Sequence, residues 1–231
     1  MREDADGRMR YEIKMTCDEV YLPEVRSLIL LHPAGFSEAY PPRQVNNIYL
    51  DTPALDCLKD HIDGTAQRSK LRFRWYGPDY TAVRGTLELK HKVGHLGWKE
   101  YSPIAATFDL TTIAWQDWLD ALRFHAQGAA AHWLSWRDRP TLLNSYTREY
   151  YESADQEIRI TLDYGPVVYE QMLYLVPNLA LQTPTAGCAV AEVKAPSTLH
   201  QRLSHVLSSL PLQVEHNSKY VSGMLDALGF L

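Results

Sequence analysis

The sequence predicts an α+β protein in which about eight antiparallel strands close into a β-barrel tunnel with peripheral helices. Several segments alternate apolar and charged residues with the two-residue period of a strand. Many of these segments are separated by hairpin-sized gaps, which favours antiparallel pairing. Helical periodicity occurs near the start, in the middle and at the end of the chain. With so many strands, closure into a barrel is favoured over an open sheet.

The expected strands are alternating or β-branched segments bounded by turn residues. They span residues 8–16, 43–51, 67–77, 83–93, 98–107, 141–153, 156–164, 167–175 and 188–195. We expect tight turns at Gly77-Pro78, between Gly94 and Gly97, and at Ala154-Asp155.

The expected helices follow from apolar residues at helical spacing. They span residues 18–31, 54–62, 111–137, 197–209 and 217–228. Asp18 is suited to cap the first helix and Pro33 to end it, while Gly64 ends the second. The middle segment is rich in tryptophan, and we expect these side chains to pack it against the barrel.

Composition restricts the class of protein. The 231 residues are 45% hydrophobic and include no linker-like stretch, so we expect one domain over residues 1–231. The net charge of −5 argues against a nucleic-acid partner but permits a locally basic cavity. No segment is long and apolar enough for a membrane span, and the polar start is unlike a secretory signal. Three widely separated cysteines favour a reducing, cytoplasmic setting.

The charged residues of the predicted strands share one face of each strand. Lys70, Arg72 and Arg74 follow one another at intervals of ~7 Å, which is repulsive unless an anion or carboxylates lie opposite. The complete same-face set is Arg10, Glu12, Lys14, Lys70, Arg72, Arg74, Glu88, Lys90, Arg148, Arg159, Asp163, Glu192 and Lys194.

This ionic face has two interpretations. A solvated outer face is common in antiparallel sheets and explains one such strand taken alone. Six strands that select Lys, Arg and Glu over Ser, Thr, Asn and Gln favour a lumen that binds a polyvalent anion. The carboxylates Glu12, Glu88 and Glu192 would neutralise part of the positive charge, and could hold a divalent metal ion when phosphate is present.

A series of short motifs runs along the chain. They are Tyr-Glu-Ile-Lys (11–14), Lys-x-Arg-x-Arg-x-Tyr (70–76), Glu-x-Lys (88–90), Arg148, Arg159, Glu-Val-Lys (192–194) and Ser-Lys-Tyr (218–220). In this order they resemble the polyphosphate polymerase (VTC) domain of the triphosphate tunnel metalloenzymes, also called the CYTH-like superfamily. The resemblance extends from Arg10 to about Met224 and implies an eight-stranded tunnel.

The resemblance also implies roles for individual residues. The set expected to line the tunnel and act in catalysis is Lys14, Arg72, Arg74, Lys90, Arg148, Arg159 and Lys194. Arg10, Lys70 and Lys219 would add phosphate contacts, the last of them at the tunnel mouth. Glu192 would be the principal ligand of Mn²⁺ or Mg²⁺, with Glu12 and Glu88 as further candidates.

The implied activity is metal-dependent phosphoryl transfer, with polyphosphate made from the γ-phosphate of ATP or another triphosphate. The superfamily often begins its first motif with Glu-x-Glu-x-Lys, whereas this chain has Arg10 in the first place, which favours the polymerase branch. Polyphosphate or pyrophosphate would be the other ligand, and protein partners are not predicted. A triphosphatase, a cyclase and a non-catalytic polyphosphate-binding module are the alternatives.

Overall fold

Nine strands form one antiparallel sheet in the computed structural model, which describes residues 10–93, 96–185, 187–210, 212–215 and 218–229. The strands are β1 (Arg10–Asp18), β2 (Ser37–Asp51), β3 (Gln67–Tyr76), β4 (Thr86–Val93), β5 (Leu96–Pro103), β6 (Arg139–Glu152), β7 (Arg159–Glu170), β8 (Cys188–Pro196) and β9 (Gln213–Val214). Hydrogen bonds join them in the order β5-β4-β3-β2-β6-β7-β8-β1-β9. The predicted α+β class is confirmed, although hydrogen bonds between the described residues do not close the sheet.

Two strand predictions differ from the structure. Residues 156–164 and 167–175 were expected as separate strands, but β7 runs through Gly165 and ends at Glu170. Gly165 has a φ of 61°, which glycine adopts without steric cost, so the strand bends there and continues. The two-residue strand β9 is too short to leave a periodic pattern in the sequence. The turn predicted between Gly94 and Gly97 lies partly outside the described residues.

The helices are α1 (Leu22–Leu30), α2 (Asp56–Ile62), α3 (Trp115–His125), α4 (Gly128–Leu134), α5 (His200–Ser208) and α6 (Lys219–Ala227). Single 3₁₀ turns precede α1 and α5, and the Asp18 side chain caps the first of them. The segment predicted as one helix over 111–137 is two helices. Gly128, with a φ of 62°, begins the second one.

The chain folds into two compact units, each built from separate segments. The first, here called the β8 unit, comprises residues 1–43, 147–165 and 187–217. The second, the β3 unit, comprises residues 44–146, 166–186 and 218–231. Strands β2, β6 and β7 contribute residues to both units. The single domain expected from composition stays a prediction.

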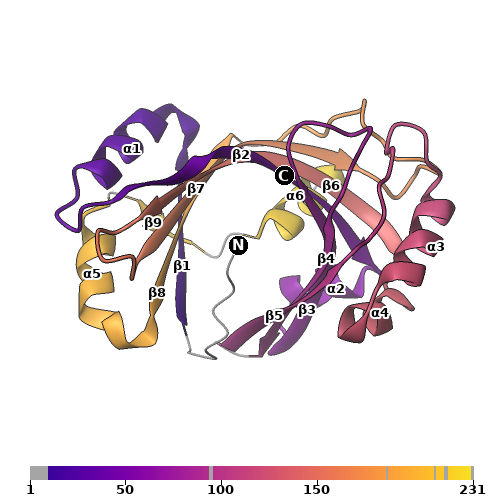
Figure 1. Cartoon of the computed structure of the whole chain (residues 1–231), viewed down its shortest axis with the longest axis horizontal. Helices are drawn as coiled ribbons and strands as arrows, with labels where there is room; N and C mark the ends of the chain where they lie inside the picture. Colours follow the sequence, from indigo (N-terminus) through magenta and orange to yellow (C-terminus); the bar gives the residue numbers. More distant parts are fainter. Residues whose placement is uncertain (1–9, 94–95, 186, 211, 216–217, 230–231) are drawn as a thin grey trace. The chain divides into compact units, whose positions relative to one another are not determined.

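Within the β8 unit, α1 and α5 cover one face of β1 and β8 (Figure 1). The core between them contains apolar residues of β1, β7 and β8, including Met15, Ile160 and Val193, all fully buried. Charged residues of the same strands alternate with these and therefore lie on the other face. The helices thus determine which face of the strands remains polar.

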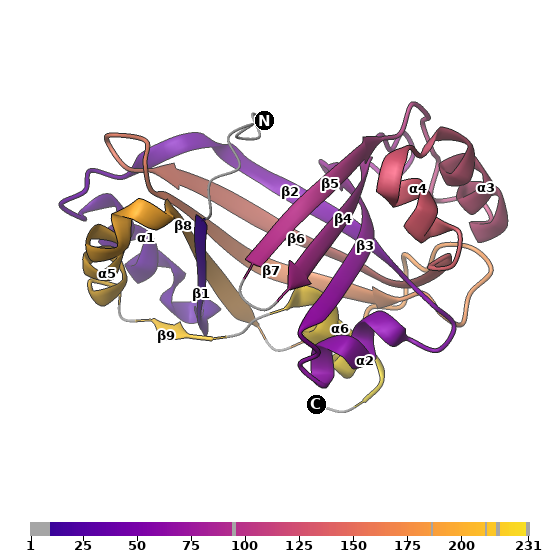
Figure 2. The same cartoon turned by 90° about the horizontal axis from the view of Figure 1, so that it is seen from below.

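Within the β3 unit, α3 and α4 pack against the apolar face of β3 and β4 (Figure 1). Phe73 and Trp118 meet edge to face, with ring centroids 5.5 Å apart. The prediction that tryptophans pack the middle segment against the sheet is confirmed for Trp118, which is fully buried. Helices α2 and α6 lie side by side next to β3 (Figure 2). Across the described residues, none of the helices combines the length and apolar character needed to cross a bilayer.

Candidate functional site

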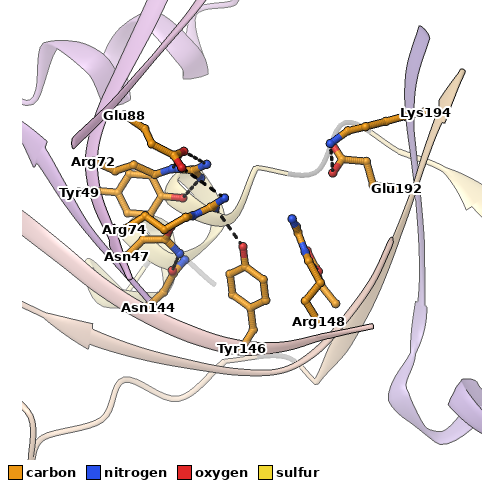
Figure 3. A network of polar contacts seen from close by, with 11 residues as sticks. Asn47, Tyr49, Arg72, Arg74, Glu88, Asn144, Tyr146, Arg148, Glu192 and Lys194 are labelled. Atoms are coloured by element: carbon orange, nitrogen blue, oxygen red, sulfur yellow. Dashed lines mark hydrogen bonds and ion pairs between the residues drawn. The ribbon is translucent and has the colours of Figure 1, made fainter. Parts of the chain in front are cut away.

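The polar face of the β3 unit includes charged side chains that alternate with apolar ones along β3. Leu71 and Phe73 are fully buried against the helices, so Arg72 and Arg74 lie on the opposite face. The antiparallel register places Arg72 opposite Glu88 of β4. Figure 3 shows both arginines directed towards Glu88.

Arg72 and Glu88 form a tight, largely buried ion pair. The Arg72 Nε and Nη2 atoms donate to Glu88 Oε2 at 2.9 and 2.5 Å, and Arg74 Nη1 lies 3.7 Å from Oε1. Burial alone would raise the pKa of Glu88, but the positive charges of Arg72, Arg74 and Lys99 outweigh it and lower that pKa to about 2. Burial likewise acts to lower the pKa of Arg72, yet the charge of Glu88 raises it overall. Both groups are therefore ionised at neutral pH.

Arg74 is held by neutral polar groups on both sides. Its Nε donates to Asn47 Oδ1 at 2.8 Å, and the Asn47 amide donates to Asn144 Oδ1 at 2.8 Å. Its Nη2 donates to the Tyr146 hydroxyl at 3.3 Å (Figure 3). The Lys219 Nζ atom, at the start of α6, lies 4.6 Å from the centroid of the Tyr146 ring. Lys219 therefore belongs to this polar face, and its predicted role in phosphate binding stays a prediction.

A row of like charges crosses the same face. Lys70 of β3 lies opposite Lys90 of β4, which lies opposite Lys99 of β5. One step along, Arg68 lies opposite Lys92. Like charges in directly opposed positions destabilise a sheet. Lys92 and Lys99 were not among the predicted site residues, although Lys92 continues the alternation of Glu88 and Lys90.

The β8 unit has a polar face with a different charge arrangement. In the register between β1 and β8, Glu12 lies opposite Lys194 and Lys14 lies opposite Glu192. Each acid therefore faces a base. Lys194 Nζ also lies 3.3 Å from Glu192 Oε2 on its own strand (Figure 3).

Two arginines of the β8 unit are likewise paired with carboxylates. Arg148 Nε and Nη2 donate to the two oxygens of the buried Asp163 at 2.5 and 2.7 Å. Arg159 Nε lies 2.8 Å from Glu152, and the Arg159 side chain is 47% exposed. Arg159 is thus the most exposed of these predicted cations whose side chains are described.

Oxygen atoms suited to a hard cation gather around Glu192. Burial would raise its pKa, but Lys194, a hydrogen bond with Glu12, and the charges of Lys14 and Arg148 hold it well below the ordinary value. The Glu12 and Glu192 carboxyl groups therefore lie side by side, with a lysine opposite each of them. Thr161, opposite Glu192 on β7, has a buried hydroxyl for which the described part of the chain offers no hydrogen-bond partner. Carboxylate and hydroxyl oxygens are ligands that fit Mg²⁺ or Mn²⁺.

Glu88 and Glu192, both predicted as metal ligands, have different surroundings. Both oxygens of Glu88 face guanidinium groups, whereas Glu192 lies next to the Glu12 carboxyl group as well as to the cations Lys194, Lys14 and Arg148. No group of three or more His, Cys, Asp or Glu side chains comes together within the described ranges. A metal ion here would therefore depend on water or a bound ligand for its remaining coordination.

The structure thus gathers the predicted residues into two sets, one in each unit. The β3 unit holds Lys70, Arg72, Arg74, Glu88, Lys90 and Lys219, and the β8 unit holds Glu12, Lys14, Arg148, Arg159, Glu192 and Lys194. Arg10 lies in β1 opposite Pro196, and its side chain is outside the described part of the chain. The neutral members Asn47, Asn144 and Tyr146 were missed because they carry no charge that marks the pattern.

The solved structures that resemble this fold include the following two proteins. A candidate adenylate cyclase from Vibrio parahaemolyticus shares 15% identity over 93% of this chain and 97% of its own, with a TM-score of 0.50. A candidate adenylyl cyclase from Hippeastrum, described as having a dominant triphosphatase activity, shares 15% identity over 96% of each chain, with a TM-score of 0.51. At this identity the likeness concerns the fold. No curated protein matches the chain.

The family follows from the sequence model that the chain matches. The model of the VTC domain matches residues 9–227, which is nearly the whole chain. The chain belongs to the VTC domain family, and the resemblance inferred from the ordered motifs is confirmed.

The Arg72–Glu88 pair predicts a pH-dependent stability. Because the Glu88 pKa is depressed on folding from ~4.3 to about 2, its stabilisation is complete above that unfolded value and is lost as pH falls towards 2. Glu88→Gln should lower the free energy of unfolding by on the order of 2–4 kcal/mol at pH 7 and by roughly half as much at pH 3. Urea unfolding at both pH values measures this, with the exposed Glu24→Gln as control. An equal penalty at the two pH values would contradict the assignment.

Proposed function

We propose that this protein transfers phosphoryl groups from a nucleoside triphosphate. In particular, we propose that it makes polyphosphate from the γ-phosphate of ATP. The observation that carries the proposal is the like-charge row Lys70, Lys90 and Lys99 beside the Arg72 and Arg74 pair. Lysines so placed form a positively charged stretch that would attract a bound polyanion, although Lys70 also donates to the Ser218 hydroxyl at 2.6 Å. Membership of the VTC domain family supports the same ligand class.

The residues of the β3 unit would bind and orient phosphates. Arg74 is fixed by Asn47 and Tyr146, and Arg72 by Glu88, so both guanidinium groups are ordered before a ligand arrives. Ordered cations stabilise the charge that develops on phosphate oxygens without further reorganisation. The acceptor phosphate is already ionised, so no general base is needed to deprotonate it.

Within the β8 unit, a second set of residues would contact phosphate and hold the metal ion. Lys14, Arg148, Arg159 and Lys194 would contact phosphate oxygens, and Glu192 with Glu12 would hold Mg²⁺ or Mn²⁺. When bound, such an ion supplies positive charge next to the phosphate oxygens. Since both oxygens of Glu88 face arginines, we assign Glu88 to arginine positioning rather than to the metal.

A triphosphatase is the second candidate function. It is favoured by the fold similarity to the Hippeastrum protein, which is described as having triphosphatase activity. The same cations would bind the triphosphate, and water would replace phosphate as the acceptor. The distribution of lysines across three strands favours the polymerase, because a single triphosphate has about four negative charges at pH 7 and needs fewer cations.

One prediction of the proposed function concerns phosphate binding. Arg72→Ala and Arg74→Ala should each weaken tripolyphosphate binding by roughly ten- to a hundredfold, because each removes a charged hydrogen-bond donor. Isothermal titration calorimetry measures the effect, with Arg123→Ala on the surface of α3 as matched control. Wild-type affinity in both variants would exclude this face as the phosphate site.

Another prediction of the proposed function tests the metal ligands. Glu192→Gln keeps the shape of the side chain but removes its charge, so metal-dependent turnover should fall by roughly tenfold or more. Binding of ATP without metal should persist, since a negative charge near the phosphates is lost. Glu24→Gln is the control for removal of an exposed carboxylate. If the variant retains wild-type metal dependence, Glu192 is not the principal ligand.

The product distinguishes the candidate functions. Purified protein incubated with ATP and Mn²⁺ should give a polyphosphate ladder on a gel, with little free phosphate in a parallel assay. Stoichiometric phosphate release without a ladder would instead identify a triphosphatase. ATP binding with neither product would identify a binding module.

A further inference from the structure

Two tyrosines and an arginine form a cluster in the β8 unit that the proposed phosphate contacts leave unexplained. Tyr40 and Tyr150 meet edge to face at 88°, with ring centroids 5.8 Å apart. The guanidinium carbon of Arg43 lies 5.3 Å from the Tyr40 ring and 5.9 Å from the Tyr150 ring. Tyr40 and Arg43 come from the start of β2, and Tyr150 from the end of β6.

The cluster lies at the surface and is not part of a hydrophobic core. Tyr40 is 52% exposed and Arg43 is exposed as well. Pro41 and Pro42 separate these two residues, and proline rings fix the backbone φ angle. The segment is therefore stiff, so a ligand that stacks on Tyr40 loses little affinity to ordering of the protein.

Tyr150 connects the cluster to the ionic face of the β8 unit. It follows Arg148 by two residues on β6 and therefore lies on the same face. Its neighbours point the other way: Glu149 accepts hydrogen bonds from Arg26, and Tyr151 belongs to the core.

The register places this aromatic cluster close to Glu192. The ion pairs Arg148–Asp163 and Arg159–Glu152 lie on either side of Tyr150 along the β6–β7 hairpin. Antiparallel geometry then puts Tyr150 opposite Thr161, which lies opposite Glu192 on β8. Tyr150 and Glu192 are thus two strand spacings apart, ~10 Å.

We propose that Tyr40, Arg43 and Tyr150 form a subsite for the base of a purine nucleoside triphosphate, an inference that rests on the proposed function. The base would stack on the exposed Tyr40 ring, and the phosphates would extend towards Lys14, Arg148 and Lys194. An aromatic ring such as Tyr40 stacks on the flat face of a base and gains little from a phosphate chain without one, whereas the Arg43 guanidinium attracts the phosphates of either ligand. The subsite would therefore make the protein prefer a nucleotide donor over inorganic phosphate chains.

Calorimetry with two probes, ATP and inorganic tripolyphosphate, tests the subsite. Tyr40→Ala should weaken ATP binding about tenfold and leave tripolyphosphate binding unchanged. Tyr40→Phe keeps the ring and should bind both ligands like the wild type. Tyr21→Ala, at an exposed tyrosine of the same unit outside the cluster, is the matched control. Circular dichroism of each variant confirms that it is folded.

The outcomes separate this inference from the proposed function. Unchanged ATP affinity in Tyr40→Ala would overturn the subsite while tripolyphosphate binding still supports the phosphate site. If Tyr40→Ala weakens the binding of ATP and of tripolyphosphate equally, the subsite is also overturned, because the tyrosine would then affect the binding of phosphate and not of the base. If the wild type binds neither probe, the proposed function fails and the subsite with it.

Discussion

The two-residue alternation of the strands is the constraint on which both polar faces depend. In β3, Leu71 and Phe73 pack against helices on one face, and this packing fixes Arg72 and Arg74 on the other. A register slip of one residue would exchange the two faces and bury guanidinium groups among apolar side chains. The free energy of that exchange is far larger than any single polar contact contributes. The apolar cores therefore determine where the cations lie.

The two units differ in how carboxylates balance the charge of their grouped cations. In the β8 unit, the register places Glu12 opposite Lys194 and Lys14 opposite Glu192, so charges alternate across neighbouring strands. In the β3 unit, one acid, Glu88, faces two arginines, and the lysines of β3, β4 and β5 oppose one another. The first arrangement is close to neutral and the second has an excess of positive charge. An anionic ligand would gain most from the second.

Sequence patterns predicted the charged members of both faces because alternation and charge coincide in β1, β3, β4 and β8. They could not identify Asn47, Asn144 or Tyr146, which support Arg74 through contacts between residues up to 97 apart in the chain. A neutral polar residue leaves no pattern in the neighbouring sequence that would indicate such a contact. The division of β7 at Gly165 was wrong because a glycine before a proline is typical of a turn, and only the pairing of the strand shows that it continues. Lys99 was missed because β5 shows little alternation of its own.

Arginine and lysine have different places in the β3 unit, and the difference bears on a polymerising reaction. Arg72 and Arg74 are fixed by hydrogen bonds to Glu88, Asn47 and Tyr146, which suits them to hold reacting phosphates in one geometry. Lysine has a flexible stem and a point charge that contacts phosphate from many directions. If the protein makes polyphosphate as proposed, a row of lysines across three strands would contact successive phosphates of a chain that shifts by one unit at each addition. Under the proposed function, the arginines would fix the reacting groups and the lysines would retain the growing product.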